Sequence, residues 1–102
     1  MAMGRNCAAH KHREDVPIEL HHIWPVGDGG PNVKTNRVSV CSNAHSSIHD
    51  LLDKGRKVLG GPAGLPWHVR WRYGRGVRQL AQAGWDAIHA AQSARDPAAQ
   101  QD

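Results

Sequence analysis

The stretch from Glu19 to Gly30 reads ELHHIWPVGDGG, and the stretch from Val40 to His49 reads VCSNAHSSIH. Apolar and polar residues alternate from Val16 to Ile23, which predicts a β-strand over Val16–Ile23. The first stretch begins within this predicted strand. Two prolines and three glycines follow between residues 25 and 36, so this part should form a compact loop. The second stretch begins within a short predicted strand, Arg37–Cys41. The two stretches therefore mark two strands joined by a loop.

A helix should follow the second strand directly. Ser42 or Asn43 can cap its start, and Lys54 with Gly55 behind it marks its end. The apolar stripe of this helix needs a surface to pack against, so the first strand must fold back onto it and bury Ile18, Leu20 and Ile48. The order of strand, strand and helix predicts an α+β fold.

The length of 102 residues suits one domain, which is expected to cover residues 1–94. The expected parts are, in order, an irregular arm (1–15), the core motif (16–54), a linker (55–66), a basic and aromatic segment that leads into a helix from about Arg75 to Ala94 (67–94), and a disordered polar tail (95–102).

Composition indicates a metal protein. Eight histidines are more than packing needs, whereas the chain has no Phe and only one Tyr to build a core. A domain this small is marginally stable without a staple, and two cysteines cannot make a disulfide framework, so metal is the expected staple. No apolar run approaches about 18 residues, so no membrane span is expected. Residues 1–5 open on no apolar signal sequence, which favours a cytoplasmic protein.

The histidines stand at spacings that suit a metal ion. His45 and His49 are four apart on the predicted helix, so both imidazoles lie on one face. The predicted strand brings His21 and His22 over that face, although neighbours on a strand point to opposite sides unless the strand twists or ends there. Three imidazoles make a site with an open position, and a fourth histidine beside it can act as a base near neutral pH.

The order of these features resembles the HNH endonuclease motif. They are the paired histidines, the Ile-x-Pro step, the Gly-Gly loop, the middle asparagine and the Cys-x-x-x-His-x-x-Ile-His start of the helix. The resemblance covers about residues 16–54. It implies an α+β fold with a ββα-metal (His-Me finger) core, here flanked by a C-terminal helix. It also implies one-metal hydrolysis of phosphodiester bonds in DNA, most simply double-stranded. Small proteins of this kind are common in bacteriophages, so phage packaging proteins are implied partners and the host cytoplasm an implied location.

Site residues follow from the resemblance by position. His21, His45 and His49 are the implied ligands of one divalent ion, and His22 is the implied general base. Asn36 would hold the loop that carries His22 through backbone hydrogen bonds. Many relatives have Asp at position 21, and three imidazoles are softer donors, which favours Zn, Ni, Co or Mn for binding. Mg or Mn remains an option for activity.

A second metal site is reduced compared with the family. Many relatives carry a four-cysteine zinc knuckle, but in this chain Ala44 and His10 stand at two of the four positions. Cys7, His10 and Cys41 remain as a candidate structural zinc site, and a degraded knuckle without metal is the alternative.

Positive charge gathers in one part of the chain. No acidic residue lies between Asp53 and Asp86, while arginines and aromatic residues interleave there. Such a stretch suits a phosphate backbone, because cations release counterions and rings stack on bases. The candidate nucleic-acid contacts are Trp67, Arg70, Trp71, Arg72, Arg75 and Arg78, with Lys34 and Arg37 near the cleft. A solvated face plus core tryptophans is the alternative.

The sequence thus predicts a metal-dependent DNA endonuclease. A non-catalytic, metal-stabilised DNA-binding or packaging module is one alternative, and an RNA-directed nuclease is another. The unligated fourth histidine argues against the first alternative, because a purely structural site has no use for it.

Overall fold

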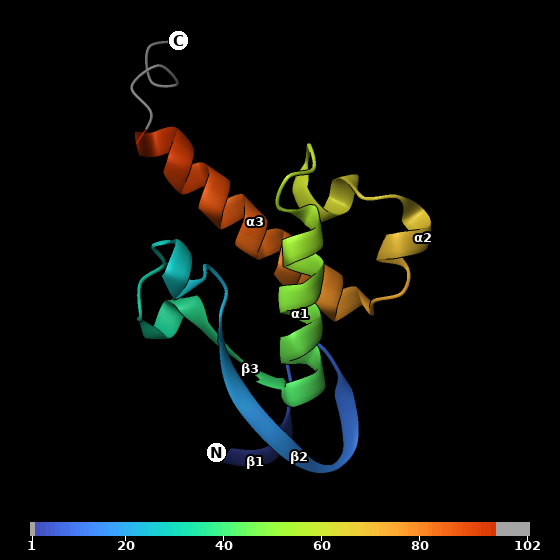
Figure 1. Cartoon of the computed structure of the whole chain (residues 1–102). Helices are drawn as coiled ribbons and strands as arrows, with labels where there is room; N and C mark the ends of the chain where they lie inside the picture. The colour runs from blue at the N-terminus through green and yellow to red at the C-terminus, as the bar shows by residue number, and fades with distance from the viewer. Residues whose placement is uncertain (1, 96–102) are drawn as a thin grey trace.

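The computed structural model describes residues 2–95, with side chains described for residues 7–10 and 16–93. The strands and helices are β1 (Ala2–Asn6), β2 (Lys11–His22), β3 (Arg37–Cys41), α1 (Ser42–Gly55), α2 (Trp67–Arg70) and α3 (Arg75–Arg95) (Figure 1). Three short 3-10 turns are η1 (Val26–Asp28), η2 (Lys34–Asn36) and η3 (Gly61–Gly64). The fold is α+β, with β2, β3 and α1 as a ββα core and α3 as its flanking C-terminal helix. Residues 96–102, for which a tail was expected, lie outside the described part.

The three strands form one antiparallel sheet in the order β1-β2-β3. The expectation of an irregular arm over residues 1–15 is wrong. Residues 2–6 form β1, and β2 starts at Lys11, five residues before the predicted start. Pairing of β1 with β2, in which Gly4 lies opposite Val16, supplies backbone hydrogen bonds that a local hydrophobic period does not reveal. Ile18 of β2 lies opposite Cys41, and His22 opposite Arg37. The expected burial of Leu20 is wrong: it is 56% exposed, because it alternates with Glu19 and His21, whose side of β2 faces α1.

Helix α1 starts one residue after β3 without a loop. Cys41 is the N-cap, and its Sγ accepts a hydrogen bond from the backbone N–H of Ala44 at 3.4 Å. The prediction of Ser42 or Asn43 as the cap is therefore wrong, because sheet pairing holds the chain extended as far as Cys41. The end of the helix, at Gly55, agrees with the sequence pattern to within one residue.

The hydrophobic core lies between α1, the sheet and α3. Ile48, Leu51 and Leu52 of α1 are fully buried, together with Val40 of β3. Helix α3 packs along α1 and contributes Val77, Ala81 and Ile88 to the same core. Figure 1 shows α3 crossing behind α1. The core motif and the C-terminal helix therefore share one hydrophobic cluster.

Residues 55–66, expected as a linker, pack against the rest of the chain. Their turn η3 contacts both α1 and α3, and Gly61 and Pro62 are buried there. Gln82 of α3 fixes this turn, since its Oε1 accepts from the N–H of Ala63 at 2.8 Å and its Nε2 donates to the carbonyl of Gly60 at 3.1 Å. Within the described residues, none of the helices is both long and apolar enough to cross a membrane.

Candidate metal centre

Three histidines from two elements meet beside α1. His21 stands near the end of β2, and His45 and His49 are one turn apart on α1. Ring centroids lie 5.4 Å apart for His21 and His45, 5.2 Å for His21 and His49, and 4.9 Å for His45 and His49. One ring nitrogen from each lies within 4.8 Å of the others. The structure thus brings together the three histidines that the family resemblance implied as ligands.

His21 is the most informative member of this cluster. Its side chain is 1% exposed, and neither of its ring nitrogens has a hydrogen-bond partner among the described residues. A buried polar group without a partner costs free energy, so this arrangement calls for a ligand on the ring. Burial, and then the neighbouring His49, His45 and His22, lower the pKa of His21 to about 4. The ring is therefore neutral at pH 7, the form that binds a cation.

His49 shares this character, because burial and then the charge of His45 lower its pKa. Burial and the neighbouring histidines disfavour protonated rings here, and neutral imidazoles are good ligands for transition metals. The donor set and its burial therefore fit one divalent ion.

His45 has a carboxylate partner that the sequence analysis missed. Its Nδ1 lies 3.0 Å from Oε1 of Glu19. A carboxylate only accepts, so Nδ1 carries the proton and Nε2 keeps its lone pair for a ligand. Glu19 stands two residues before His21 on β2, and residues two apart on a strand share a face. That spacing was the signal available in the sequence.

His22 lies apart from the three-histidine cluster. Its Nε2 is 2.9 Å from Oδ1 of Asn32, a residue of the β2–β3 loop that the sequence analysis also missed. β2 ends at His22, as expected from the restriction that the following Trp24-Pro25 step imposes. The amide oxygen accepts from Nε2–H, which leaves Nδ1 as the ring's lone-pair nitrogen.

The side chain of Asn36 ties the end of β2 to the loop. Its Oδ1 accepts from the N–H of Trp24, and its Nδ2 donates to the carbonyls of Trp24 and Pro31, each at 2.9 Å. Its own carbonyl accepts from the N–H of Ile23 at 2.9 Å. All four bonds join residues beyond His22 to the end of the loop, so Asn36 fixes the path of the chain that follows the histidine pair.

A second clamp holds the same loop to α1. The Arg56 guanidinium donates two hydrogen bonds to the carboxylate of Asp28, at 3.1 and 2.9 Å, and a third to Asp53 at 3.1 Å. The hydrogen bond from Arg56 lowers the pKa of Asp28. Gly30 closes the loop on itself, since a Cβ there would lie 1.9 Å from the carbonyl oxygen of Trp24. The loop beside the histidines is therefore fixed at both ends.

Cys7, His10 and Cys41 form a second cluster near the start of α1. Their ligand atoms lie within 4.8 Å of one another. Nδ1 of His10 is 3.3 Å from Sγ of Cys41, whose backbone N–H donates to Sγ of Cys7 at 3.2 Å. Two residues that precede the core motif and one at the end of its second strand are thus brought to one place.

The residues singled out for nucleic-acid contact lie in two places. Lys34 is in η2, at the end of the β2–β3 loop, and Arg37 begins β3 opposite His22, so Arg37 shares a face of the sheet with His22. The other six come from α2, the turn after it and the first turn of α3: Trp67, Arg70, Trp71, Arg72, Arg75 and Arg78. In Figure 1, α2 lies on the opposite side of α1 from the β2–β3 loop. The predicted contacts therefore do not form one continuous set.

Comparison with known proteins assigns the core. Residues 5–51 match the family model for HNH endonuclease. Neither a curated protein nor a solved structure matches the chain. The matched segment contains β2, β3, the loop with Asn36 and all four histidines of the motif. Residues 5–51 are therefore similar to HNH endonuclease domains.

Proposed function

We propose that the chain is a metal-dependent DNA endonuclease that hydrolyses phosphodiester bonds at the His21–His45–His49 cluster. The observation that carries this proposal is the buried His21 ring, which has no described hydrogen-bond partner and faces two further imidazoles. Burial of a ring without a hydrogen-bond partner costs free energy, and binding of a cation by this donor set would offset that cost.

In this mechanism His21, His45 and His49 hold the ion, and Glu19 keeps His45 in the tautomer that presents Nε2. When bound, a divalent ion supplies Lewis-acid stabilisation of charge on the phosphate oxygens. His22 takes the proton from the attacking water on Nδ1, because Asn32 occupies its Nε2. Asn36 and the Arg56–Asp28 clamp keep the loop beside His22 in position. Arg37 and Lys34 add positive charge near the scissile phosphate.

We propose DNA, most simply double-stranded, as the substrate and the cytoplasm as the place of action, which is the host cytoplasm if the chain comes from a phage. A phage packaging apparatus is the proposed protein partner. These finer points are supported by the family alone. Zn, Ni, Co or Mn should bind the three imidazoles most tightly, with Mg or Mn as the activating ion.

The test combines metal analysis with cleavage of a supercoiled plasmid in added Mn. Cleavage that disappears with a chelator and returns with the ion would support the proposal. A metal-loaded protein that binds the plasmid without cutting it would favour the non-catalytic module. Preferential digestion of RNA in a parallel reaction would favour an RNA-directed nuclease.

We also propose that the Cys7–His10–Cys41 cluster binds a structural zinc ion, with a fourth position outside this residue set. Soft thiolates and an imidazole within 4.8 Å are supporting geometry. Elemental analysis should then find about two metal ions per chain, and Cys41→Ser should remove one while plasmid cleavage declines only through stability. One metal ion in both proteins would mean that the knuckle is degraded.

A further inference from the structure

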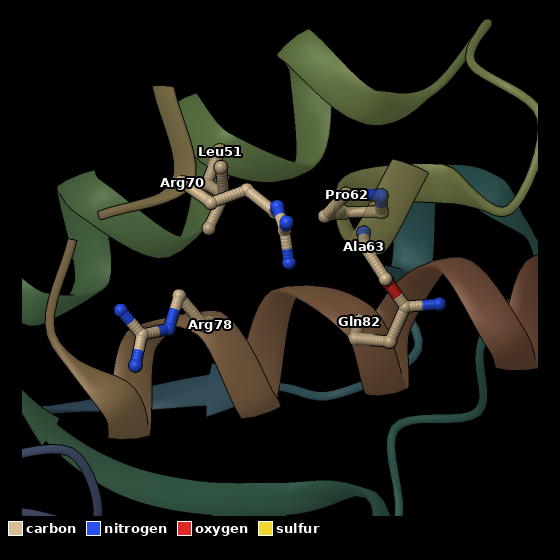
Figure 2. Close-up of a pocket in the computed structure, with 6 residues that line it drawn as sticks. All are labelled: Leu51, Pro62, Ala63, Arg70, Arg78 and Gln82. Atoms are coloured by element: carbon tan, nitrogen blue, oxygen red, sulfur yellow. The ribbon is translucent and has the colours of Figure 1, made fainter. Parts of the chain in front are cut away.

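A pocket lies on the side of α1 that does not carry the metal centre. It has a volume of about 130 Å³ and is lined by Leu51 of α1, Pro62 and Ala63 of η3, and Arg70, Arg78 and Gln82 around α2 and α3 (Figure 2). All of these residues except Leu51 lie beyond the matched residues 5–51. Drug-sized ligands occupy pockets of roughly 300 Å³ or more, so this one suits a small group.

The donors in this pocket belong mainly to Arg70. Its Nε donates to the carbonyl of Leu65 at 2.9 Å, which fixes the plane of the guanidinium. Its two terminal nitrogens have no hydrogen-bond partner within residues 2–95, and Figure 2 shows the group extending into the space between Leu51 and Pro62. The polar atoms of Gln82 are already used by η3 and Asp86. The open donors of the pocket are thus those of a fixed guanidinium.

Arg78 adds a second positive charge at the edge. One of its terminal nitrogens donates to the carbonyl of Tyr73 at 3.0 Å, and its guanidinium lies 4.3 Å from the ring centroid of Trp71. Neither Arg70 nor Arg78 has a carboxylate within ion-pair distance in the described part of the chain. Two braced arginines without a carboxylate partner raise the local affinity for an anion.

The surface around the pocket indicates which anion. Trp67 and Trp71 of this segment are 68% and 66% exposed, although aromatic rings of this size usually bury most of their area. Exposed rings beside a phosphate-sized pocket are an arrangement that suits a nucleotide unit, with the phosphate on arginine and the base on indole.

We propose that Arg70 and Arg78 form a phosphate-binding pocket for a nucleic-acid strand, separate from the cleavage site, with Trp71 and Trp67 as stacking surfaces for adjacent bases. This inference rests on the proposed action on nucleic acid, and adds a second contact point to it. Because the pocket and the metal centre lie on different sides of α1, the anchored phosphate is not the one that is cut.

The first experiment is a titration of the full chain with inorganic phosphate and with a 5′-phosphorylated dinucleotide, followed by residue-resolved NMR. Both ligands should shift the side-chain N–H signals of Arg70 and Trp71, and the dinucleotide should also shift Trp67. Shifts from inorganic phosphate alone would reassign the pocket to the free ion. Shifts confined to His21, His45 and His49 would overturn the proposal.

The second experiment compares matched variants. Arg70→Gln should weaken dinucleotide binding about tenfold or more, as expected for loss of charge-assisted hydrogen bonds, whereas Lys57→Gln, an exposed cation outside the pocket, should change it less than about twofold. Equal effects of the two would mean a diffuse charged surface and no pocket. If Arg70→Gln is less stable, Ala63→Glu places a negative charge at the exposed edge and should weaken binding, with Ala90→Glu as its control.

Plasmid cleavage is measured in parallel so that two failures stay distinct. If the parent protein cuts plasmid and the Arg70 variant still binds the dinucleotide normally, the pocket is rejected and the proposed nuclease activity is retained. Dinucleotide binding that depends on Arg70, in a protein that cuts neither DNA nor RNA, would reject the nuclease and retain the pocket as a nucleic-acid contact.

Discussion

At the scale of single residues, the neighbours His21 and His22 have different surroundings. His21 is buried among imidazoles, whereas His22 is half-buried and hydrogen-bonded to Asn32 of the loop. Adjacent residues on a strand face opposite ways, and β2 ends at His22. His21 therefore contacts the histidines of α1, whereas His22 contacts the loop. The two positions should therefore respond differently to the same substitution.

His22→Ala should retain the metal ion and the fold but cut DNA about 10²–10⁴-fold more slowly, because removal of a positioned base has that cost. His21→Ala should lose both metal affinity and thermal stability, since the ion contributes to folding. Metal content, thermal unfolding and plasmid cleavage distinguish them. Equal metal loss in both variants would show that the roles of the pair are assigned wrongly.

Glu19 provides a second residue-level test. Glu19→Ala should weaken metal binding by about 10–100-fold, because a carboxylate partner fixes the tautomer and basicity of a ligating imidazole. Glu19→Gln keeps an acceptor for the Nδ1–H of His45 and should recover part of that affinity. Competition with a chromophoric chelator measures both. Unchanged affinity in Glu19→Ala would mean that the 3.0 Å contact does not support the ligand.

The spacing of the histidines predicted a shared site, and the family resemblance assigned His21 to it, but its supporting residues were not predictable to the same degree. Glu19 lies two residues before His21 and therefore shares its strand face, as the two-residue repeat of a β-strand indicates. Asn32 is different, because its contact with His22 depends on the path of a loop that is set by the bonds of Asn36. Local sequence does not determine such a path.

At the scale of elements, the β2–β3 loop and α1 are held together by the Arg56–Asp28 clamp. The hydrogen bond from Arg56 lowers the pKa of Asp28, so the ionised carboxylate stabilises the native state. Its contribution is complete above the unfolded pKa near 4 and is lost as pH falls through the lower native value.

Asp28→Asn should accordingly reduce the free energy of unfolding at pH 7, by about 1 kcal/mol for a pair at this partly exposed site. The difference from the parent protein should shrink as pH falls below about 4. Chemical denaturation at pH values from about 2.5 to about 7 measures this difference in the free energy of unfolding. Asp53→Asn, which removes a single, more exposed contact of Arg56, is the control and should have a smaller effect. A difference that does not depend on pH would exclude the ionised pair as its source.

The elements themselves differ in how well the sequence predicts them. Helix α1 and strand β3 follow from local pattern, and α3 begins at Arg75 as predicted. Strand β1 does not, because it exists through its pairing with β2, and the paired residues lie 12 to 16 positions apart in the sequence, as at Gly4–Val16 and Ala2–Ile18. Non-local pairing of this kind leaves little trace in local periodicity.

At the scale of the whole molecule, α3 packs directly on the end of β2. A Cβ at Gly84 would lie 2.9 Å from the carbonyl oxygen of Ile23 and 3.4 Å from Leu52. The C-terminal helix thus approaches the backbone just beyond His22, and only a residue without a side chain allows this approach.

Gly84→Val should lower the free energy of unfolding by about 1–3 kcal/mol, as overpacking of a close contact does. Plasmid cleavage should fall as well, because the end of β2 carries His22. Ala90→Val, at an exposed position of the same helix, controls for the helix propensity of valine and should have little effect. Similar losses in both variants would mean that β-branching alone accounts for the result.

The shared core also limits how far the nuclease motif can be moved to another protein. Leu51, the last matched residue, and Leu52 directly after it belong to the same buried cluster as Val77, Ala81 and Ile88 of α3. A graft that carried only the motif residues would present this apolar face of α1 to solvent, where it would favour association with other chains. The unit that could be transplanted is therefore larger than its sequence signature, and extends at least to Ile88.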